Sequence, residues 1–282
     1  MNLYQHVGVA VAFSPRLHAL LCEAAFHGLR LGSRLGLIHA GAASEEKRRR
    51  LREALREAGL PEDTPIHWAA QGSPDEAILR VVEQQQMDLL LAGALEKERA
   101  LRYYLGSVAH NLVREAPCSL LLLTDPSAAP APFRRIVVVT DYSESAVVAL
   151  AKALRFADDE GAEGVHVVRV RSAYGEAMLL SEGVRRERAE RYQARTLAEE
   201  EALLADFVVS AGRHEVPVEA HVIEGQTGLV LAQFAREKQA DLLVMPSSSR
   251  QSHFFERLFP SDMEWVLREI PCNLWVARER LQ

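Results

Sequence analysis

The fold is decided by residues 88–123, which read DLLLAG (88–93), ALEKERALRYYL (94–105), GS (106–107) and VAHNLVREAPCSLLLL (108–123). Residues 88–92 are apolar and are followed by Gly93, which is typical of a short parallel strand buried on both faces. Residues 108–114 are predicted to form a helix, and residues 118–123 a second buried strand. A helix that starts just after Gly106 and Ser107 presents backbone N–H groups to which an anion can bind.

This stretch resembles the C-terminal signature of the universal stress protein family, G-x2-G-x9-G-[ST]. Gly93 matches the first glycine, and Gly106 and Ser107, followed by Val108, match the closing pair. Position 96, where the signature has its second glycine, is Glu96. In the family this loop wraps the triphosphate of ATP, and glycine lets the backbone approach closely. Glu96 adds a side chain and a negative charge there, so the resemblance implies the fold more strongly than the ligand.

The composition is that of a globular protein in a reducing compartment. The 282 residues suit one large or two ordinary domains, with 48% hydrophobic and 26% charged residues. The formal net charge of −6 argues against a nucleic-acid partner. The chain has no apolar run of membrane-span length and no leader pattern, so we expect a cytoplasmic protein without a membrane span. Its three cysteines, Cys22, Cys118 and Cys272, form neither a disulfide framework nor a metal motif.

The first half of the chain alternates between strand and helix patterns. Strands are predicted at residues 7–12, 35–40 and 66–70, before the two strands of the opening stretch. Ser14 is expected to cap a first helix with Pro15 at its first position, and further helices are expected over residues 44–58 and 75–86. Such alternation indicates a parallel sheet with helices on both faces.

The same pattern then repeats. Residues 136–143 match 7–14, residues 240–245 match 87–92, and residues 268–274 match 114–120. A repeat of this length predicts two copies of one domain, with residues 1–125 as the first, 126–132 as a proline-rich linker and 133–282 as the second. The fold class is therefore α/β, with two tandem doubly wound domains, each a five-stranded parallel sheet, and the family resemblance implies the strand order 3-2-1-4-5. The resemblance then covers the whole chain as a tandem-type universal stress protein.

The second copy is longer than the first between its second and third strands. The extra residues fall in 171–215, a segment rich in Arg, Glu and Ala that is predicted to form one lengthened helix or two. Its charges suit a solvated helix face. Leu179, Leu180 and Val184 leave open the alternative of a flap over the neighbouring site.

The family resemblance implies the same nucleotide site in each copy. An Asp after the first strand lies near adenine and ribose, and it corresponds to Ala12 in the first copy and Asp141 in the second. The apolar residue of the second strand that flanks adenine corresponds to Ala40 and Val170. The phosphate loop of the second copy has three substitutions relative to the signature, because Pro246, Ser249 and Pro260 stand at its glycine positions, whereas Ser261 matches the closing Ser.

Each copy thus lacks a different part of the site. The first has two glycines without the Asp, and the second has the Asp with prolines, which lack the N–H donor that phosphate needs. We therefore expect weak or absent ATP binding in the first copy, with Mg²⁺ only if ATP binds. In the second copy classical ATP binding is not expected. A different small ligand there is the alternative, since residues 245–250 offer hydroxyls and a guanidinium.

The remaining motifs are weaker. His18 with Cys22, and Glu23 with His27, stand at helical i,i+4 spacing, but each pair is too small a ligand set for a metal. No nucleophile elbow, P-loop or dinucleotide fingerprint is present, so no catalytic residue is predicted and an enzymatic role is not expected.

The two closing strands, residues 118–123 and 272–277, would each leave a bare apolar edge. Members of the family pair these edges across a dimer. Here the two copies can pair them within one chain as an internal pseudo-dimer, and a homodimer of the whole chain stays open. Two functions follow: a non-enzymatic stress-response protein with degenerate nucleotide sites that acts through unknown protein partners, or an ATP/AMP-binding switch that uses the first domain, with slow or no ATPase activity.

Overall fold

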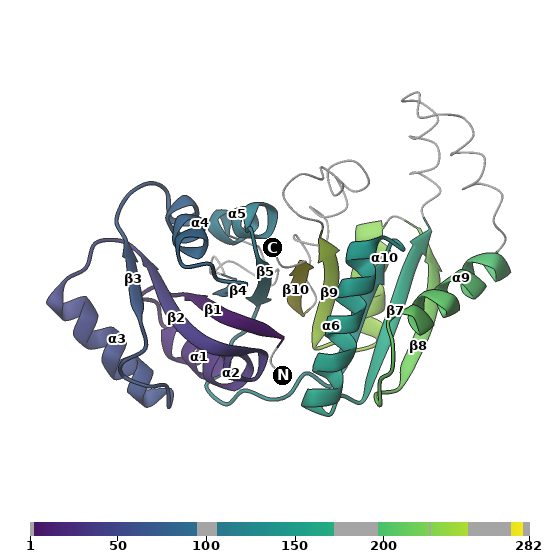
Figure 1. The fold of residues 1–282 in the computed structure, drawn as a ribbon, viewed down its shortest axis with the longest axis horizontal. Helices are drawn as coiled ribbons and strands as arrows, with labels where there is room; N and C mark the ends of the chain where they lie inside the picture. Colours follow the sequence, from purple (N-terminus) through teal and green to yellow (C-terminus); the bar gives the residue numbers. More distant parts are fainter. Residues whose placement is uncertain (1–2, 95–105, 172–196, 226, 248–271, 279–282) are drawn as a thin grey trace, which may run out of the picture. The chain divides into compact units, whose positions relative to one another are not determined.

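The computed structural model describes residues 3–94, 106–171, 197–225, 227–247 and 272–278. The chain divides into two compact units (Figure 1). The first comprises residues 1–132 with 273–282, and the second residues 133–272. Among the described residues, no helix is long and apolar enough to cross a membrane.

The first unit contains a parallel sheet in the order β3-β2-β1-β4-β5. Its strands are β1 (Tyr4–Ala10), β2 (Gly32–Ala40), β3 (Ile66–Ala69), β4 (Leu89–Gly93) and β5 (Ser119–Leu123). Strand β5 and all but the last residue of β4 are buried, as their unbroken apolar runs predict for strands covered on both faces. The order 3-2-1-4-5 predicted from the sequence is confirmed in this unit.

Helices cover both faces of this sheet (Figure 1). They are α1 (Leu17–Glu23), continued by a π-helical turn (Ala24–Gly28) and α2 (Leu29–Leu31), then α3 (Glu45–Glu57), α4 (Pro74–Gln84) and α5 (Ser107–Glu115). Ser44 caps α3 by accepting a hydrogen bond from the backbone N–H of Lys47, at 3.2 Å. The predicted cap of the first helix is wrong: α1 begins at Leu17, and Ser14 instead takes part in a turn through its backbone.

Strand β10 (Asn273–Arg278) pairs antiparallel with β5, which confirms that the two closing strands pair within one chain. The buried indole of Trp275 donates a hydrogen bond to the hydroxyl of Tyr4, 3.1 Å away. The guanidinium of Arg278 donates to the carbonyl of Val113, also at 3.1 Å. The sequence predicted this strand as the fifth of the second sheet, and the strand order β10-β9-β6-β7-β8 agrees with that prediction, while the compact division groups the strand with the first unit.

The second unit contains the parallel strands β9-β6-β7-β8. The strands are β6 (Arg135–Thr140), β7 (Gly164–Arg171), β8 (Val218–Glu224) and β9 (Leu242–Ser247). Its described helices are α6 (Glu144–Glu160), α9 (Leu197–Ser210) and α10 (Thr227–Glu237). Helix α6 ends at Gly161, whose φ of 65° is the left-handed conformation that glycine adopts at a helix end.

Of two further predicted segments, the linker is described completely and the helical segment only in part. The predicted linker, residues 126–132, is fixed near its start, because the backbone N–H of Ser127 donates to the buried carboxylate of Glu23 at 2.9 Å. In the predicted helical segment 171–215, residues 197–210 form α9. Leu179, Leu180 and Val184 lie outside the described residues, and so does the predicted flap.

Candidate nucleotide site

The first unit brings the predicted positions together at one edge of its sheet. Strand β1 lies between β2 and β4, with Ala10 opposite both Ile38 and Ala92. Ala12, Ala40 and Gly93 therefore follow or end three adjacent parallel strands at their carboxyl ends. The strand order reverses at β1, and a doubly wound sheet binds its ligand at this switch point.

The N-terminus of α5 belongs to the same edge, because a helix that precedes a parallel strand begins where the previous strand ends. Gly106 is its N-cap residue, with φ −64° and ψ 153°, and no side chain caps the helix. Ser107 is the first helical residue, followed by Val108. The first-turn amides, together with the helix dipole, favour an anion here. Glu96 lies outside the described residues.

Gly93 has room for a side chain. A Cβ added to it would meet the side chain of Leu20 at 3.9 Å, which is ordinary van der Waals contact. Packing among the described residues therefore does not require glycine at this position. If Gly93 matters for a ligand, it does so through its backbone.

An aromatic cluster lies beside this edge on the face that α3 covers. The His39 ring packs edge-on against Phe13 and Trp68, with centroids 4.9 and 5.3 Å away. Two α3 guanidiniums lie over the outer rings, Arg50 4.8 Å from the Phe13 centroid and Arg48 5.4 Å from that of Trp68. Since neighbouring strand residues point to opposite faces, Ala40 faces away from this cluster. No sequence motif predicted this cluster, although His39 and Trp68 both stand near strand ends.

In the second unit the predicted carboxylate is already bonded within the protein. Oδ1 of Asp141 accepts hydrogen bonds from the backbone N–H of Ser143 at 3.0 Å and from its hydroxyl at 2.6 Å. The Ser143 hydroxyl oxygen also accepts from the N–H of Ala146, which caps α6. Asp141 and Ser143 thus form a turn that starts a helix.

A buried ion pair lies next to this turn. The Nε atom of Arg169 is 3.0 Å from a carboxylate oxygen of Glu200, and both side chains are at most 7% exposed. The Tyr142 hydroxyl donates to the same carboxylate at 2.9 Å, and the Tyr142 ring packs edge-on against Phe207. Through these contacts α9 covers one face of the second sheet near the carboxyl ends of its strands. No sequence motif predicted this pair, and an Arg between two valines of β7 was the available signal.

The other predicted positions of the second unit stay untested. Val170 is buried at the end of β7 and, by alternation along the strand, faces away from Arg169. Pro246 lies in the buried strand β9. Ser249, Pro260 and Ser261 lie outside the described residues.

The geometry is that of a doubly wound α/β protein, with the N-terminus of α5, which no side chain caps, at the switch point of the first sheet. A model of the universal stress protein family matches residues 40–124 and 132–278. The two matches span most of the sequence, and the chain belongs to the universal stress protein family as a tandem of two such domains. A comparison with curated proteins found no match.

Solved structures show the same fold. A protein of Pseudomonas aeruginosa UCBPP-PA14, provisionally described as a universal stress protein, is 18% identical with a TM-score of 0.68, over 98% of this chain and 93% of that one. A universal stress protein of Archaeoglobus fulgidus DSM 4304 is 17% identical with a TM-score of 0.63, over 97% and 98%. A universal stress protein in complex with cAMP matches 52% of this chain and 98% of its own, at 21% identity and a TM-score of 0.33.

Proposed function

We propose that this chain is a stress-response protein that acts by binding partners rather than by catalysis, with a weakened nucleotide site in the first unit and a lost one in the second. The observation that carries the proposal is the bonding of Asp141. Its Oδ1 atom accepts two hydrogen bonds from Ser143. A nucleotide that used this oxygen would have to compete with both bonds, each with a net value of about 1 kcal/mol.

The first unit lacks the carboxylate but has the helix N-terminus that can bind phosphate. Ala12 has no carboxylate for the base or ribose, whereas the start of α5 still offers amides to a phosphate. Affinity should then come from the phosphates more than from the base. Mg²⁺ would enter only with the nucleotide, because this ion is usually held through substrate phosphates.

The alternative function is an ATP/AMP-binding switch in the first unit. It is favoured by Gly106, which caps α5 with its backbone alone, and by Gly93, which the described packing does not require to be glycine. Under this alternative ATP binds tightly despite Ala12 and Glu96.

Calorimetric titration of the full chain with ATP and Mg²⁺, and then with AMP, separates the two functions. Asp is a favoured N-cap and its charge suits a helix N-terminus, so Gly106→Asp should preserve α5 while repelling phosphate. Gly106→Asn, an uncharged N-cap, is the matched control. We expect weak binding that Gly106→Asp lowers by roughly 10-fold or more relative to Gly106→Asn, since one like charge nearby costs about 1–4 kcal/mol. Asp141→Ala should leave the heat of ATP binding unchanged.

Three results would contradict the proposal. Loss of ATP binding in Asp141→Ala, together with unchanged binding in Gly106→Asp, would assign the nucleotide to the second unit. Micromolar binding at the first unit would favour the switch, and release of phosphate on a multiple-turnover time scale would show an enzyme.

A further inference from the structure

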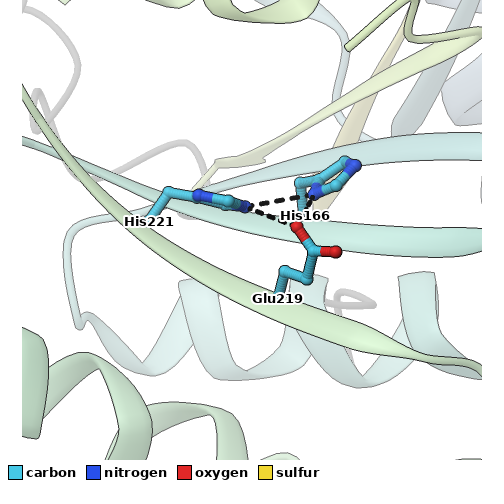
Figure 2. Close-up of side chains that lie close together, drawn as sticks. All are labelled: His166, Glu219 and His221. Atoms are coloured by element: carbon cyan, nitrogen blue, oxygen red, sulfur yellow. Dashed lines mark hydrogen bonds and ion pairs between the residues drawn. The ribbon is translucent and has the colours of Figure 1, made fainter.

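Three potential metal ligands of the second sheet point at one another (Figure 2), on the face that Phe234 of α10 covers. His166 lies on β7, and Glu219 and His221 lie on β8. The strand register places His166 opposite Glu219. His221 is two residues further along β8 and so points to the same face.

The three ligand atoms form a nearly equilateral triangle. Nδ1 of His166 is 3.1 Å from Nε2 of His221, and each of these nitrogens is 3.3 Å from Oε2 of Glu219. Ligands held about 2.0–2.1 Å from a tetrahedral zinc ion lie ~3.3 Å from one another. The separations therefore match three corners of such a tetrahedron.

Hydrogen bonds between neutral imidazoles cannot satisfy all three contacts. If both facing nitrogens carry hydrogen, two N–H groups oppose each other at 3.1 Å. If only one does, the other nitrogen turns its lone pair toward the Glu219 carboxylate at 3.3 Å. A cation at the centre of the triangle would accept all three lone pairs at once.

We propose that His166, Glu219 and His221 form a site for a divalent transition-metal ion of the zinc class, with one coordination position open to solvent. Two imidazoles and a carboxylate are a ligand set that zinc accepts. The side chains of His166 and His221 are 13% and 23% exposed, whereas that of Glu219 is 61% exposed. The open position therefore faces water on the Glu219 side.

The surroundings orient the ligands. The Phe234 ring of α10 packs against both imidazoles, with centroids 6.1 Å from His166 and 4.9 Å from His221. Burial, followed by the charge of Lys238, lowers the pKa of both histidines, which favours the neutral imidazole that binds metal. The pKa of Glu219 is lowered by His166 and Lys238, which keeps it ionised.

Lys238 is the competing cation. Its Nζ atom lies 3.6 Å from the same Glu219 oxygen that completes the triangle. A metal must therefore displace this ammonium, whose side chain is 33% exposed and can turn toward solvent. Removing the charge of Lys238 should strengthen metal binding, whereas removing a histidine should weaken it.

The test is calorimetric titration of the full, EDTA-treated chain with ZnCl2. We expect one zinc ion per chain in the micromolar range or tighter. His166→Gln and His221→Gln should each weaken zinc binding by more than the roughly 10–100-fold loss of affinity that follows removal of an outer-shell hydrogen-bond partner. Lys238→Met should bind several-fold more tightly. Cobalt(II) should give the visible d–d bands of a low-coordinate site, and both histidine variants should lose them.

Matched controls exclude binding elsewhere, since the chain has ten histidines. His214→Gln removes a histidine of the same unit that contacts the carbonyl of Val216. Glu224→Gln removes an exposed carboxylate of β8 that pairs with Arg171. Both should bind zinc as the unmodified chain does. Equal affinity in His166→Gln, His221→Gln and the unmodified chain would overturn the proposal, and so would no binding at millimolar zinc. Circular dichroism in EDTA checks that each variant is folded.

Discussion

Glu200 and Asp141 are both carboxylates near the carboxyl edge of the second sheet, and both accept hydrogen bonds from protein donors. Glu200 is bonded to Arg169 and Tyr142, and Asp141 to Ser143. Tyr142 holds a left-handed φ of 63°, which is uncommon for a residue with a bulky side chain, and its bond to Glu200 helps to hold it there. Residues that could have bound a ligand therefore maintain the local structure.

The buried pair gives a stability prediction. Arg169→Met leaves the Glu200 carboxylate buried without its cation, and we expect the free energy of unfolding to fall by about 3–5 kcal/mol. Arg171→Met on the same strand removes an arginine paired with the exposed Glu224, and it should cost at most about 1 kcal/mol. Urea titration of the two variants gives the comparison. Equal decreases in the free energy of unfolding would show that burial does not strengthen the pair of Arg169 with Glu200.

The cysteines give a prediction about reactivity. Burial raises the pKa of both Cys118 and Cys272 to about 12, so near neutral pH almost no thiolate is present at either residue. Ellman's reagent should therefore label neither thiol quickly in the folded chain, and Cys22→Ser should show no fast phase. Unfolding that variant should expose both thiols. Fast labelling of folded Cys22→Ser would mean that one of these sites opens readily.

Among the elements, the two helices near Ser14 and Ser44 show what a local motif can and cannot determine. Both serines stand just before a predicted helix, but only Ser44 caps one. Arg16, not Ser14, is the N-cap residue of α1, and the chain between them forms a turn. Where the helix begins is decided by the packing of Leu20 and Leu21, both buried, more than by the capping residue.

Ser44→Ala should lower the free energy of unfolding by about 1 kcal/mol, because the N–H of Lys47 loses its acceptor. Ser14→Ala should change it by no more than about 0.5 kcal/mol, as for a surface substitution without a special role. Thermal or urea unfolding of both variants measures the difference. A larger effect at Ser14 would support the cap predicted from the sequence.

The order of the strands in the first sheet could be predicted from the family resemblance, whereas the apolar runs and the repeat specify only the strands themselves and the two copies. The cluster of His166, Glu219 and His221 could not. Glu219 and His221 alternate as polar residues on any half-exposed strand do, and His166 comes opposite Glu219 only through the register of β7 with β8. The bonding of Asp141 was also missed, because the family motif indicates a pocket there whereas Ser143 offers two nearer donors.

At the scale of the whole molecule, β10 joins residues at the two ends of the sequence within one unit. The Tyr4 and Trp275 rings lie edge to face, 6.2 Å apart between centroids, and share a hydrogen bond. This contact makes the stability of the first unit depend on residues that follow the second.

Trp275→Phe should cost about 1 kcal/mol through loss of the bond to Tyr4, and Trp275→Ala about 3–5 kcal/mol through the cavity that it leaves. A variant that ends at Cys272 should lose more, because the buried strand β5 then has a bare apolar edge. Light scattering should show that this variant associates. A monodisperse, equally stable variant would contradict the role given to β10.

The position of β10 also affects how the protein is made. A ribosome adds about 5–20 residues per second, and domains usually fold in order as they emerge. Here the second unit is inserted between the two parts of the first. The outer edge of β5 must therefore stay unpaired until the second unit has been synthesised. During that interval the nascent chain exposes the apolar edge of β5. The need for chaperones during translation should therefore increase with the number of residues in the inserted unit.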